Sequence, residues 1–358
     1  MDVLQMENFK CFVKQKIEFA DLTALVGANG AGKSSVIQSL LLLRQSIENP
    51  FVKELQLNGP YGLCLGMDGS IGNNTVPSGI TKFSFKSGID TFAIHLKAQS
   101  QEEKLSIDIA HKGDALMRRE FFAKEFYYLS ADRKGPRVSQ PMQSLSFDHT
   151  GIYGEYTAQI LARPYTKIEM RRMYSGTVVN TLNKQTNLWL NSILPGVEVK
   201  AEKNVQMQTA QVLIKNGVTD DFLTSTNIGF GISYALPIIV TGLIAKRGCY
   251  MLVENPEAHL HPAAQSAMGR FLAMLSQNGV RVIVETHSEH ILNGIRLYAA
   301  QNKIDLKSVM IHNFEIQEAK VHVDSIRYTD RYTYDKWPKG FLDQSSADYL
   351  EYYQAIQM

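Results

Sequence analysis

Residues 27–35 read GANGAGKSS. It matches the P-loop pattern G-x-x-x-x-G-K-[ST], in which glycines turn successive backbone N–H groups toward one anion. An apolar segment, LTALV at 22–26, precedes it, and VIQSLLLLRQSI at 36–47 follows it. This is the order of a buried strand, a phosphate-binding loop and a helix whose positive N-terminal end faces the phosphate. The stretch therefore predicts a P-loop α/β fold.

The residue types in this loop predict how it binds a nucleotide. Lys33 is expected to reach the β- and γ-phosphates, and the Ser34 hydroxyl is expected to bind a magnesium ion. The predicted phosphate-binding residues of the loop are Gly27, Asn29, Gly30, Ala31, Gly32, Lys33, Ser34 and Ser35. The predicted cofactors are ATP and Mg²⁺.

The composition argues against several classes of protein. The chain has 358 residues, 44% hydrophobic and 20% charged, which is enough for a globular core. A formal net charge of +2 gives no global attraction to nucleic acid. Its three cysteines are far apart, which favours a reduced protein without disulfides. Charges interrupt the N-terminus, and the longest apolar run is shorter than the ~20 residues that span a bilayer. We expect a soluble, cytoplasmic protein with no membrane partner.

Strand and helix signals alternate along the chain. Residues 3–9 and 22–26 predict strands, and the segments 80–86, 91–98 and 104–111 predict an antiparallel meander. No sustained heptads occur, so no long coiled coil is expected. We predict four parts of one globular head: a P-loop lobe with an antiparallel β-subdomain (1–137), a mixed α/β insert (138–226), a lobe with a glycine-rich helix start and two buried strands (227–316), and a tail (317–358).

A second buried strand ends in an acid. CYMLV at 249–253 leads into Glu254, which predicts a second contact, beside Ser34, to the magnesium ion. Many nucleotide hydrolases place another acid next, to polarise the attacking water, but here Asn255 has that position and Glu257 follows a proline. Asparagine can orient a water but cannot accept its proton, and a general base contributes ~10²–10⁴-fold in rate. Either Glu257 acts as a displaced base or hydrolysis is slow; we favour slow hydrolysis with Glu257 contributing.

The surrounding histidines offer other interpretations. Glu257 could instead be a loop partner of His259 or His261. No third ligand at suitable spacing joins these two histidines, so we predict no zinc site.

Two further segments complete the candidate site. His287 ends the apolar strand VRVIVETHS at 280–288 and is predicted to approach a terminal phosphate from a neighbouring parallel strand. In TSTNIGFGIS at 224–233, Gly229 and Gly231 open a helix and form a second potential phosphate cradle. Since one nucleotide needs only one P-loop, this second cradle fits a nucleotide that another subunit holds.

The order of these motifs resembles that of the ATP-binding-cassette ATPases: a P-loop, a glycine-rich signature before a helix, ENPEAHLHP and ETHS. Within them the chain is similar to the SMC and overcoming-lysogenization-defect (OLD) branch. The opening ENFKCF, the segment PEAHLHP and the tail KWPKGFLD are similar to a bacterial group of small stand-alone AAA-type ATPases. Several of their relatives, such as the ATPase subunit of Septu-type systems, belong to anti-phage defence.

The resemblance implies a homodimer in which two heads sandwich two ATP molecules, with a higher oligomer left open. Gly229 and Gly231 would contact the γ-phosphate in trans, His287 would be the switch histidine, and AHLH at 258–261 would cross the dimer interface. The chain departs from the family because its signature, NIGFGIS, is not of the Ser-Gly-Gly type, so the contact relies on backbone or on Asn227. It also has no clear glutamine-bearing loop, for which Arg133 and Arg137 are candidate substitutes.

These features lead to competing functions. The first is an ATPase that dimerises around ATP, senses or clamps nucleic acid such as double-stranded DNA, and gates a partner effector. OLD-type nucleases carry an acidic nuclease domain after the ATPase, whereas the tail after His287 has no acidic cluster, so a nuclease is expected in trans. The second is a non-hydrolysing ATP-bound scaffold, which Asn255 favours. A membrane-transporter subunit fits less well, because it would more often show a Ser-Gly-Gly signature.

Overall fold

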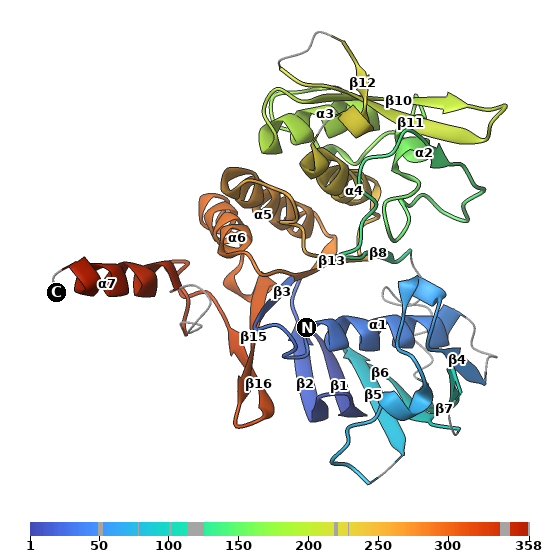
Figure 1. Cartoon of the computed structure of the whole chain (residues 1–358), viewed down its shortest axis with the longest axis vertical. Helices are drawn as coiled ribbons and strands as arrows, with labels where there is room; N and C mark the ends of the chain where they lie inside the picture. Colours follow the sequence, from blue (N-terminus) through green and yellow to red (C-terminus); the bar gives the residue numbers. More distant parts are fainter. Residues whose placement is uncertain are drawn as a thin grey trace.

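The computed structural model describes residues 1–48, 53–77, 79–99, 102–112, 125–217, 221–227, 229–336 and 344–356. Within these residues the strands form three sheets (Figure 1). A central, mostly parallel sheet carries the P-loop, an antiparallel sheet lies on one side of it, and a smaller sheet with two helices lies at the far end. This is the mixed α/β architecture that the sequence predicts.

The central sheet has the strand order β16-β15-β3-β14-β13-β8. All neighbours are parallel except the β15–β16 pair. The strands are β3 (Leu22–Gly27), β8 (Tyr127–Leu129), β13 (Tyr250–Glu254), β14 (Arg281–Glu285), β15 (Val309–Gln317) and β16 (Lys320–Ile326). The middle strands are apolar along almost their whole length because both faces of a parallel sheet are covered.

The second sheet has the order β2-β1-β5-β6-β7-β4 and is antiparallel. It confirms the predicted meander, and it contains two strands, β2 and β4, that were not predicted from the sequence. Its strands are β1 (Asp2–Phe9), β2 (Phe12–Phe19), β4 (Glu54–Gln56), β5 (Ile80–Ser87), β6 (Asp90–Lys97) and β7 (Lys104–Lys112). β2 is polar along its middle, so its sequence alone carries a weak strand signal.

The third sheet is small and joins β10 (Glu198–Asn204), β11 (Thr209–Lys215), β12 (Leu223–Thr224) and β9 (Gln140–Pro141). The α-helices are α1 (Lys33–Glu48), α2 (Thr157–Leu161), α3 (Leu182–Ile193), α4 (Phe230–Ile244), α5 (Pro262–Gln277), α6 (Glu289–Gln301) and α7 (Gln344–Ile356). Short 3₁₀ turns lie at Pro60–Gly62, Asp68–Ser70, Met170–Arg172, Ser225–Asn227 and Leu306–Ser308.

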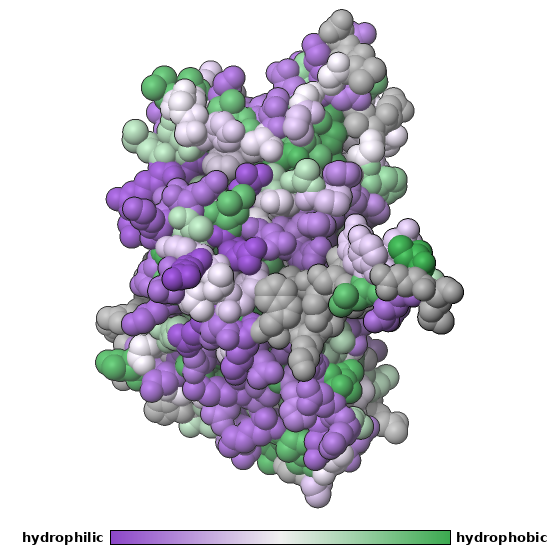
Figure 2. Space-filling view, turned by 90° about the vertical axis from the view of Figure 1, so that its left-hand side faces the viewer, coloured by the Kyte–Doolittle hydropathy of each residue, from purple (hydrophilic) through white to green (hydrophobic). Residues whose placement is uncertain are grey.

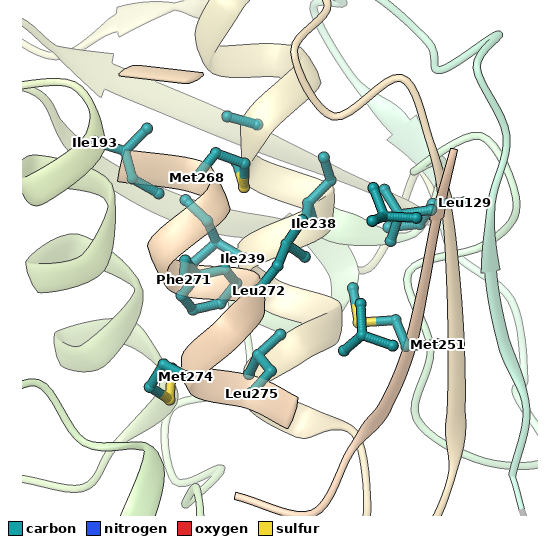
Figure 3. Packing of buried hydrophobic residues seen from close by; sticks show 14 of the residues in the cluster. Leu129, Ile193, Ile238, Ile239, Met251, Met268, Phe271, Leu272, Met274 and Leu275 are labelled. Atoms are coloured by element: carbon teal, nitrogen blue, oxygen red, sulfur yellow. The ribbon is translucent and has the colours of Figure 1, made fainter. Parts of the chain in front are cut away.

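Two hydrophobic cores lie on opposite faces of the central sheet. Because side chains alternate along a strand, Met251 and Val253 of β13 belong to the core under α4 and α5, whereas Leu252 belongs to the core under α1 and the antiparallel sheet. Figure 3 shows the first core, in which Phe271 and Leu272 of α5 face Ile238 and Ile239 of α4. The central sheet therefore fixes the positions of helices that are far apart in sequence.

The central sheet crosses three of the four predicted parts of the chain. The central sheet alone takes strands from residues 22–27, 127–129, 250–254, 281–285 and 309–326. The tail supplies its edge strand β16 and then α7, which projects from the body (Figure 1). Residues 337–343, which include most of the tail motif KWPKGFLD, lie outside the described residues.

Among the described residues, the face from which α7 projects carries no broad apolar area (Figure 2). Figure 2 shows that this face is mostly hydrophilic and that its hydrophobic residues form small, separate groups. None of the helices that the structure describes is long and apolar enough to cross a membrane.

Helices α5 and α6 touch backbone to backbone through two glycines. A Cβ atom on Gly269 would lie 2.2 Å from the Ile291 carbonyl oxygen, and one on Gly294 would lie 2.1 Å from the Ser266 carbonyl oxygen. Neither neighbour can move without moving its helix. We expect Gly269→Ala and Gly294→Ala each to lower the free energy of unfolding by about 3 kcal/mol.

Urea unfolding measures this loss. Gly69→Ala is the matched control, because a Cβ atom there meets no atom within 4 Å, and its stability should stay close to that of the wild type. Equal stability of all three variants would contradict the close helix contact.

Candidate nucleotide-binding site

The P-loop curls around its own lysine. The Lys33 ammonium donates hydrogen bonds to the carbonyl oxygens of Gly27 (2.9 Å) and Ala28 (2.7 Å), and only 4% of the residue is exposed. Burial lowers the pKa of Lys33, an effect that Glu285 opposes. Position 27 requires glycine for two reasons. Its φ is +119°, and a Cβ atom there would lie 2.1 Å from the Phe314 carbonyl oxygen of β15. The loop is therefore shaped by the neighbouring strand as well as by its own glycines.

A cavity of about 480 Å³ opens at the loop. It gathers side chains from the P-loop, the β1–β2 turn, α1 and the ends of β13 and β14. Its lining residues are Lys10, Cys11, Asn29, Gly30, Gly32, Lys33, Ser34, Ser35, Gln38, Asn255, Glu285 and His287. Six predicted P-loop residues, Asn255 and His287 are thus brought together, whereas Glu254, Glu257, Gly229 and Gly231 are not among the lining residues.

The strand order decides which acid meets Ser34. β14 lies between β3 and β13, so Glu285 is next to the P-loop and Glu254 is one strand further away. The Ser34 hydroxyl donates a 2.9 Å hydrogen bond to Glu285 Oε1. Ser34 and Glu254 are both predicted to contact the magnesium ion, and in the structure the carboxylate that the Ser34 hydroxyl contacts is that of Glu285. The missed signal was available, because Glu285 ends the apolar run VRVIVE just as Glu254 ends CYMLVE.

Glu254 faces the other way. Its carboxylate accepts hydrogen bonds from the Tyr128 hydroxyl (3.1 Å) and from the backbone N–H of Ala131 (3.0 Å). Both donors belong to β8 and the loop after it. Burial raises the pKa of Glu254, although these two hydrogen bonds and Arg133 lower it.

Glu254 and Glu285 are paired residues in the β13–β14 register. Burial raises the pKa of Glu285 to about 7, and the negative charge of Glu254 raises it too, against the lowering effects of Ser34 and Lys33. Only 5% of Glu285 is exposed. Two buried acids at one edge of a sheet therefore favour the binding of a positive charge beside the P-loop.

Glu257 is held by the loop that carries His287. Its carboxylate accepts hydrogen bonds from the Thr286 hydroxyl (2.7 Å) and from the backbone N–H of His287 (2.8 Å). The Asn255 side-chain amide lies 3.4 Å from Glu257 Oε1. Glu257 thus joins the loop after β13 to the loop after β14, and its partners are not His259 or His261.

His287 and Asn255 reach the cavity from these two loops. Burial lowers the pKa of His287, and so does the Lys33 ammonium, while Glu257 raises it. The imidazole is therefore neutral near pH 7 and can offer one N–H and one acceptor nitrogen. Asn255 adopts a positive φ of 44°, which turns the chain sharply just after the strand end.

Arg133 supports the acid-bearing strand rather than lining the cavity. Its guanidinium donates to the carbonyl oxygens of Ser130 (2.8 Å), Glu254 (2.6 Å) and Asn255 (2.6 Å). It also lies over the Tyr234 ring, 5.4 Å from the centroid, and only 1% of the residue is exposed. The predicted role of Arg133 as a substitute for a nucleotide-sensing glutamine therefore does not fit its position. Arg137 is likewise not among the lining residues.

Of the two signature glycines, Gly231 packs against the 255–261 loop of its own chain, and Gly229 lies in open space. A Cβ atom on Gly231 would be 2.8 Å from the His259 carbonyl oxygen, and the rings of Phe230 and His259 are 5.3 Å apart. Gly229 caps α4, is exposed, and would have no atom within 4 Å of an added Cβ. The side chain of Asn227 lies outside the described residues.

The β1–β2 turn supplies cavity residues that the sequence analysis did not identify. The Lys10 ammonium donates a 2.6 Å hydrogen bond to Gln38 Oε1 of α1, and burial lowers the pKa of Lys10. Lys10 and Cys11 belong to the segment ENFKCF that carried the family resemblance. Their position near the P-loop depends on β2, a strand that the sequence analysis missed.

Comparison with known families agrees with this arrangement. The model of the AAA ATPase domain family matches residues 1–144 and 169–292, which together make up more than half of the chain. The chain belongs to the AAA ATPase domain family. The search of curated proteins found no match to this AAA ATPase domain.

Solved structures of SMC heads share its fold. The Smc head bound to the C-winged helix domain of ScpA matches with a TM-score of 0.57 and 14% identity, over 91% of this chain and 97% of that one. A Smc head domain with an extended coiled coil, bound to the C-terminal domain of ScpA derived from Pyrococcus furiosus, matches with a TM-score of 0.54 and 10% identity, over 99% and 100% of the two chains. The predicted SMC-head type of P-loop fold is confirmed.

The residues at the cavity fit a magnesium ion. Magnesium in nucleotide sites is usually held by one or two protein oxygens together with phosphates and waters. Here Ser34 and Glu285 offer such oxygens, and Glu285 Oε2 is buried without a hydrogen-bond partner among the described residues. The described residues contain no cluster of three or more ligating side chains, so a metal ion in this AAA ATPase domain would depend on the phosphates as well.

The raised pKa of Glu285 makes a pH-dependent contribution to stability. Between pH 4.5, the ordinary value, and about 7, the folded protein keeps a proton that the unfolded chain has released. The contribution of Glu285 to the free energy of unfolding is therefore present at low pH and lost as the pH rises through 7. In EDTA, we expect the wild type to lose about 3 kcal/mol of its free energy of unfolding between pH 4.5 and 8 through Glu285. Glu285→Gln should not show this part of the loss.

Urea unfolding at several pH values measures this difference. The exposed Glu103→Gln is the matched control and should follow the wild-type curve. Parallel curves for the wild type and Glu285→Gln would mean that Glu285 is ionised without penalty.

Proposed function

We propose that this AAA ATPase domain binds ATP with magnesium in the P-loop cavity, hydrolyses it slowly, and dimerises around it to gate a partner effector. The observation that carries the proposal is the convergence of Lys33, Ser34, Glu285 and His287 on one cavity at the N-terminus of α1. Lys33 would meet the β- and γ-phosphates, and the neutral His287 would donate to the γ-phosphate. A bound magnesium ion would neutralise charge on the phosphates.

Slow hydrolysis follows from the residue beside the cavity. Asn255 lines it and can orient a water, but an amide cannot take the proton of that water. The Glu257 carboxylate accepts hydrogen bonds from Thr286 and His287, so it is already engaged as an acceptor away from the cavity lining. We propose that Glu257 contributes by positioning His287 rather than by removing a proton.

Dimerisation would complete the site. Gly229 lies at the exposed start of α4 and is absent from the lining of its own cavity. The same helix end offers free backbone N–H groups to an anion. We propose that Gly229 and Gly231, with Asn227, contact the γ-phosphate of ATP held by a second copy, and that the adjoining 258–261 loop lies at the interface.

The effector is proposed by analogy. The similar SMC heads are named as complexes with domains of ScpA, so heads of this fold can carry a protein partner. For this chain we propose a nuclease in trans, double-stranded DNA as the sensed ligand, and a role in anti-phage defence, on the family resemblance of ENFKCF and PEAHLHP. ATP would act by stabilising a closed dimer that binds the effector differently from the open form.

A second function is favoured by one observation. Asn255 in the place of an acid is what a non-hydrolysing, ATP-bound scaffold would contain. Such a scaffold would share the nucleotide site and the dimer, and it would differ only in turnover.

Turnover separates these two functions. We expect slow ATP hydrolysis by the wild type, and an increase of about 10²-fold for Asn255→Glu, which restores a carboxylate beside the cavity. Phosphate release should be measured with and without double-stranded DNA, with Lys33→Ala as the background control. If Glu257→Gln abolishes turnover and Asn255→Glu does not raise it, Glu257 is the base. A silent wild type that Asn255→Glu activates would identify the scaffold.

The trans contact makes a separate prediction. Gly229→Glu adds a carboxylate in open space, so monomer stability and ATP affinity should stay unchanged. ATP-dependent dimerisation, followed by light scattering, should be lost because the new charge would face the partner's phosphates. Mixing Gly229→Glu with Lys33→Ala should restore one intact site per dimer. An ATP-dependent dimer of Gly229→Glu alone would contradict the sandwich.

A further inference from the structure

Helix α7 carries an apolar stripe that its own chain leaves uncovered. The helix projects from the body, and its residues from 348 to 356 are all exposed (Figure 1). Its large apolar and aromatic side chains are between 56% and 65% exposed, and they are Tyr349, Leu350, Tyr352, Tyr353 and Ile356. Those at 349, 352, 353 and 356 share one face, because residues three and four apart are neighbours on a helix. A 13-residue helix is only marginally stable by itself in water, so α7 needs a partner for this stripe.

A groove of about 1130 Å³ lies between α3, residues 171–175 and the helices α5 and α6. Aromatic rings line it: Tyr174 and Trp189 pack edge to face with their centroids 5.1 Å apart, and Tyr298 of α6 joins them. Tyrosine, tryptophan and arginine are the side chains that most often anchor protein interfaces. The groove therefore has the composition of a docking site for a segment of protein.

The charges of the groove and of α7 are opposite. Arg171 and Arg270 line the groove, none of its described lining residues is acidic, and neither arginine makes an ion pair within the described part of the chain. Helix α7 contains two acids, Asp348 and Glu351, and no lysine or arginine. Asp348 also borders the stripe, because it is four residues before Tyr352. An acidic, tyrosine-rich helix is thus an occupant whose charge complements that of the groove.

The groove and α7 also match in length and in position. Along α5 the groove runs from Ala267 to Gln277, which is ~15 Å at ~1.5 Å per residue, and the stripe of α7 is ~10 Å long by the same measure. Helices α5 and α6 lie on the side of the body from which α7 projects, and α7 points away from that body (Figure 1). Two copies that face each other on this side can exchange their α7 helices about a twofold axis.

We propose that α7 of one copy docks in this groove of a second copy, with its tyrosine stripe on the aromatic rings and its acids attracted to Arg171 and Arg270. This exchange needs no nucleotide and goes beyond the proposed function. The ATP sandwich is proposed at the 258–261 loop before α5, whereas the groove includes Arg270, Met274 and Gln277 of the second half of that helix. ATP would then join exchanged pairs into larger assemblies.

The oligomeric state without nucleotide tests the exchange. Light scattering over a range of concentrations should show the full chain as a dimer. Tyr349→Ser/Tyr353→Ser should make the protein monomeric, because the stripe is lost. Gln354→Ser is the matched control on the same helix, since position 354 lies outside the stripe, and it should stay dimeric.

Reversal of charge identifies the two surfaces. Arg171→Glu/Arg270→Glu and Asp348→Lys/Glu351→Lys should each weaken the dimer about tenfold or more, because like charges then meet. A mixture of these two variants should recover a dimer, since each α7 again meets a groove of opposite charge. Recovery also shows that both variants are folded.

The outcomes are distinct. The control Lys86→Glu/Lys97→Glu reverses two exposed charges on the antiparallel sheet and should stay dimeric. A wild type that is monomeric without nucleotide at every concentration would overturn the proposal, and this includes the case in which α7 folds into the groove of its own chain. A dimer that survives both charge reversals, or a mixture that stays monomeric, would overturn it too. A failure to bind ATP would contradict the proposed function and leave this dimer unchanged.

Discussion

The parallel pairing of β14 between β3 and β13 is the constraint on which the candidate site depends. Parallel strands end at the same edge of a sheet, so three loops that are far apart in sequence open beside one another. The loop after β3 is the P-loop, the loop after β13 carries Asn255, and the loop after β14 carries His287. A change in strand order would leave each motif intact and would separate the residues that must act together.

Buried polar contacts make this edge rigid. Arg133 binds the carbonyl oxygens of Glu254 and Asn255, which lie where the ladder of β13 ends and its last acceptors need a donor. Glu257 then joins the loop after β13 to Thr286 and to the backbone of His287. Neither residue lines the cavity, yet both determine where Asn255 and His287 lie. The charged side chains of Arg133 and Glu257 hold the backbone of these loops in place. In this buried environment, a polar group without a partner would cost free energy.

The arrangement separates the chemistry of binding from that of hydrolysis. Phosphate binding has a lysine, a helix N-terminus and a neutral histidine already in place. After β13, where many nucleotide hydrolases carry an acid, this chain has Asn255, and the carboxylate of Glu257 on the same loop accepts two hydrogen bonds. Such a site fits the slow hydrolysis that we propose.

Short-range sequence patterns were enough to predict the fold class, the P-loop with Lys33 and Ser34, the antiparallel meander, and the position of Asn255 and His287 near the P-loop. These follow from short-range patterns: strand periodicity, glycines that free backbone N–H groups, and acids or histidines at the ends of apolar runs. The polar strand β2, with the cavity residues Lys10 and Cys11 beside it, has no comparable pattern and was missed.

Three features depend on long-range packing: which acid lies beside Ser34, what Glu257 and Arg133 contact, and the position of Gly229 and Gly231 outside the cavity lining of their own chain. The reason is physical. CYMLVE and VRVIVE are equivalent as strands, and nothing in either segment records its neighbour. Strand order is a property of long-range packing, and it placed Glu285, not Glu254, against the P-loop.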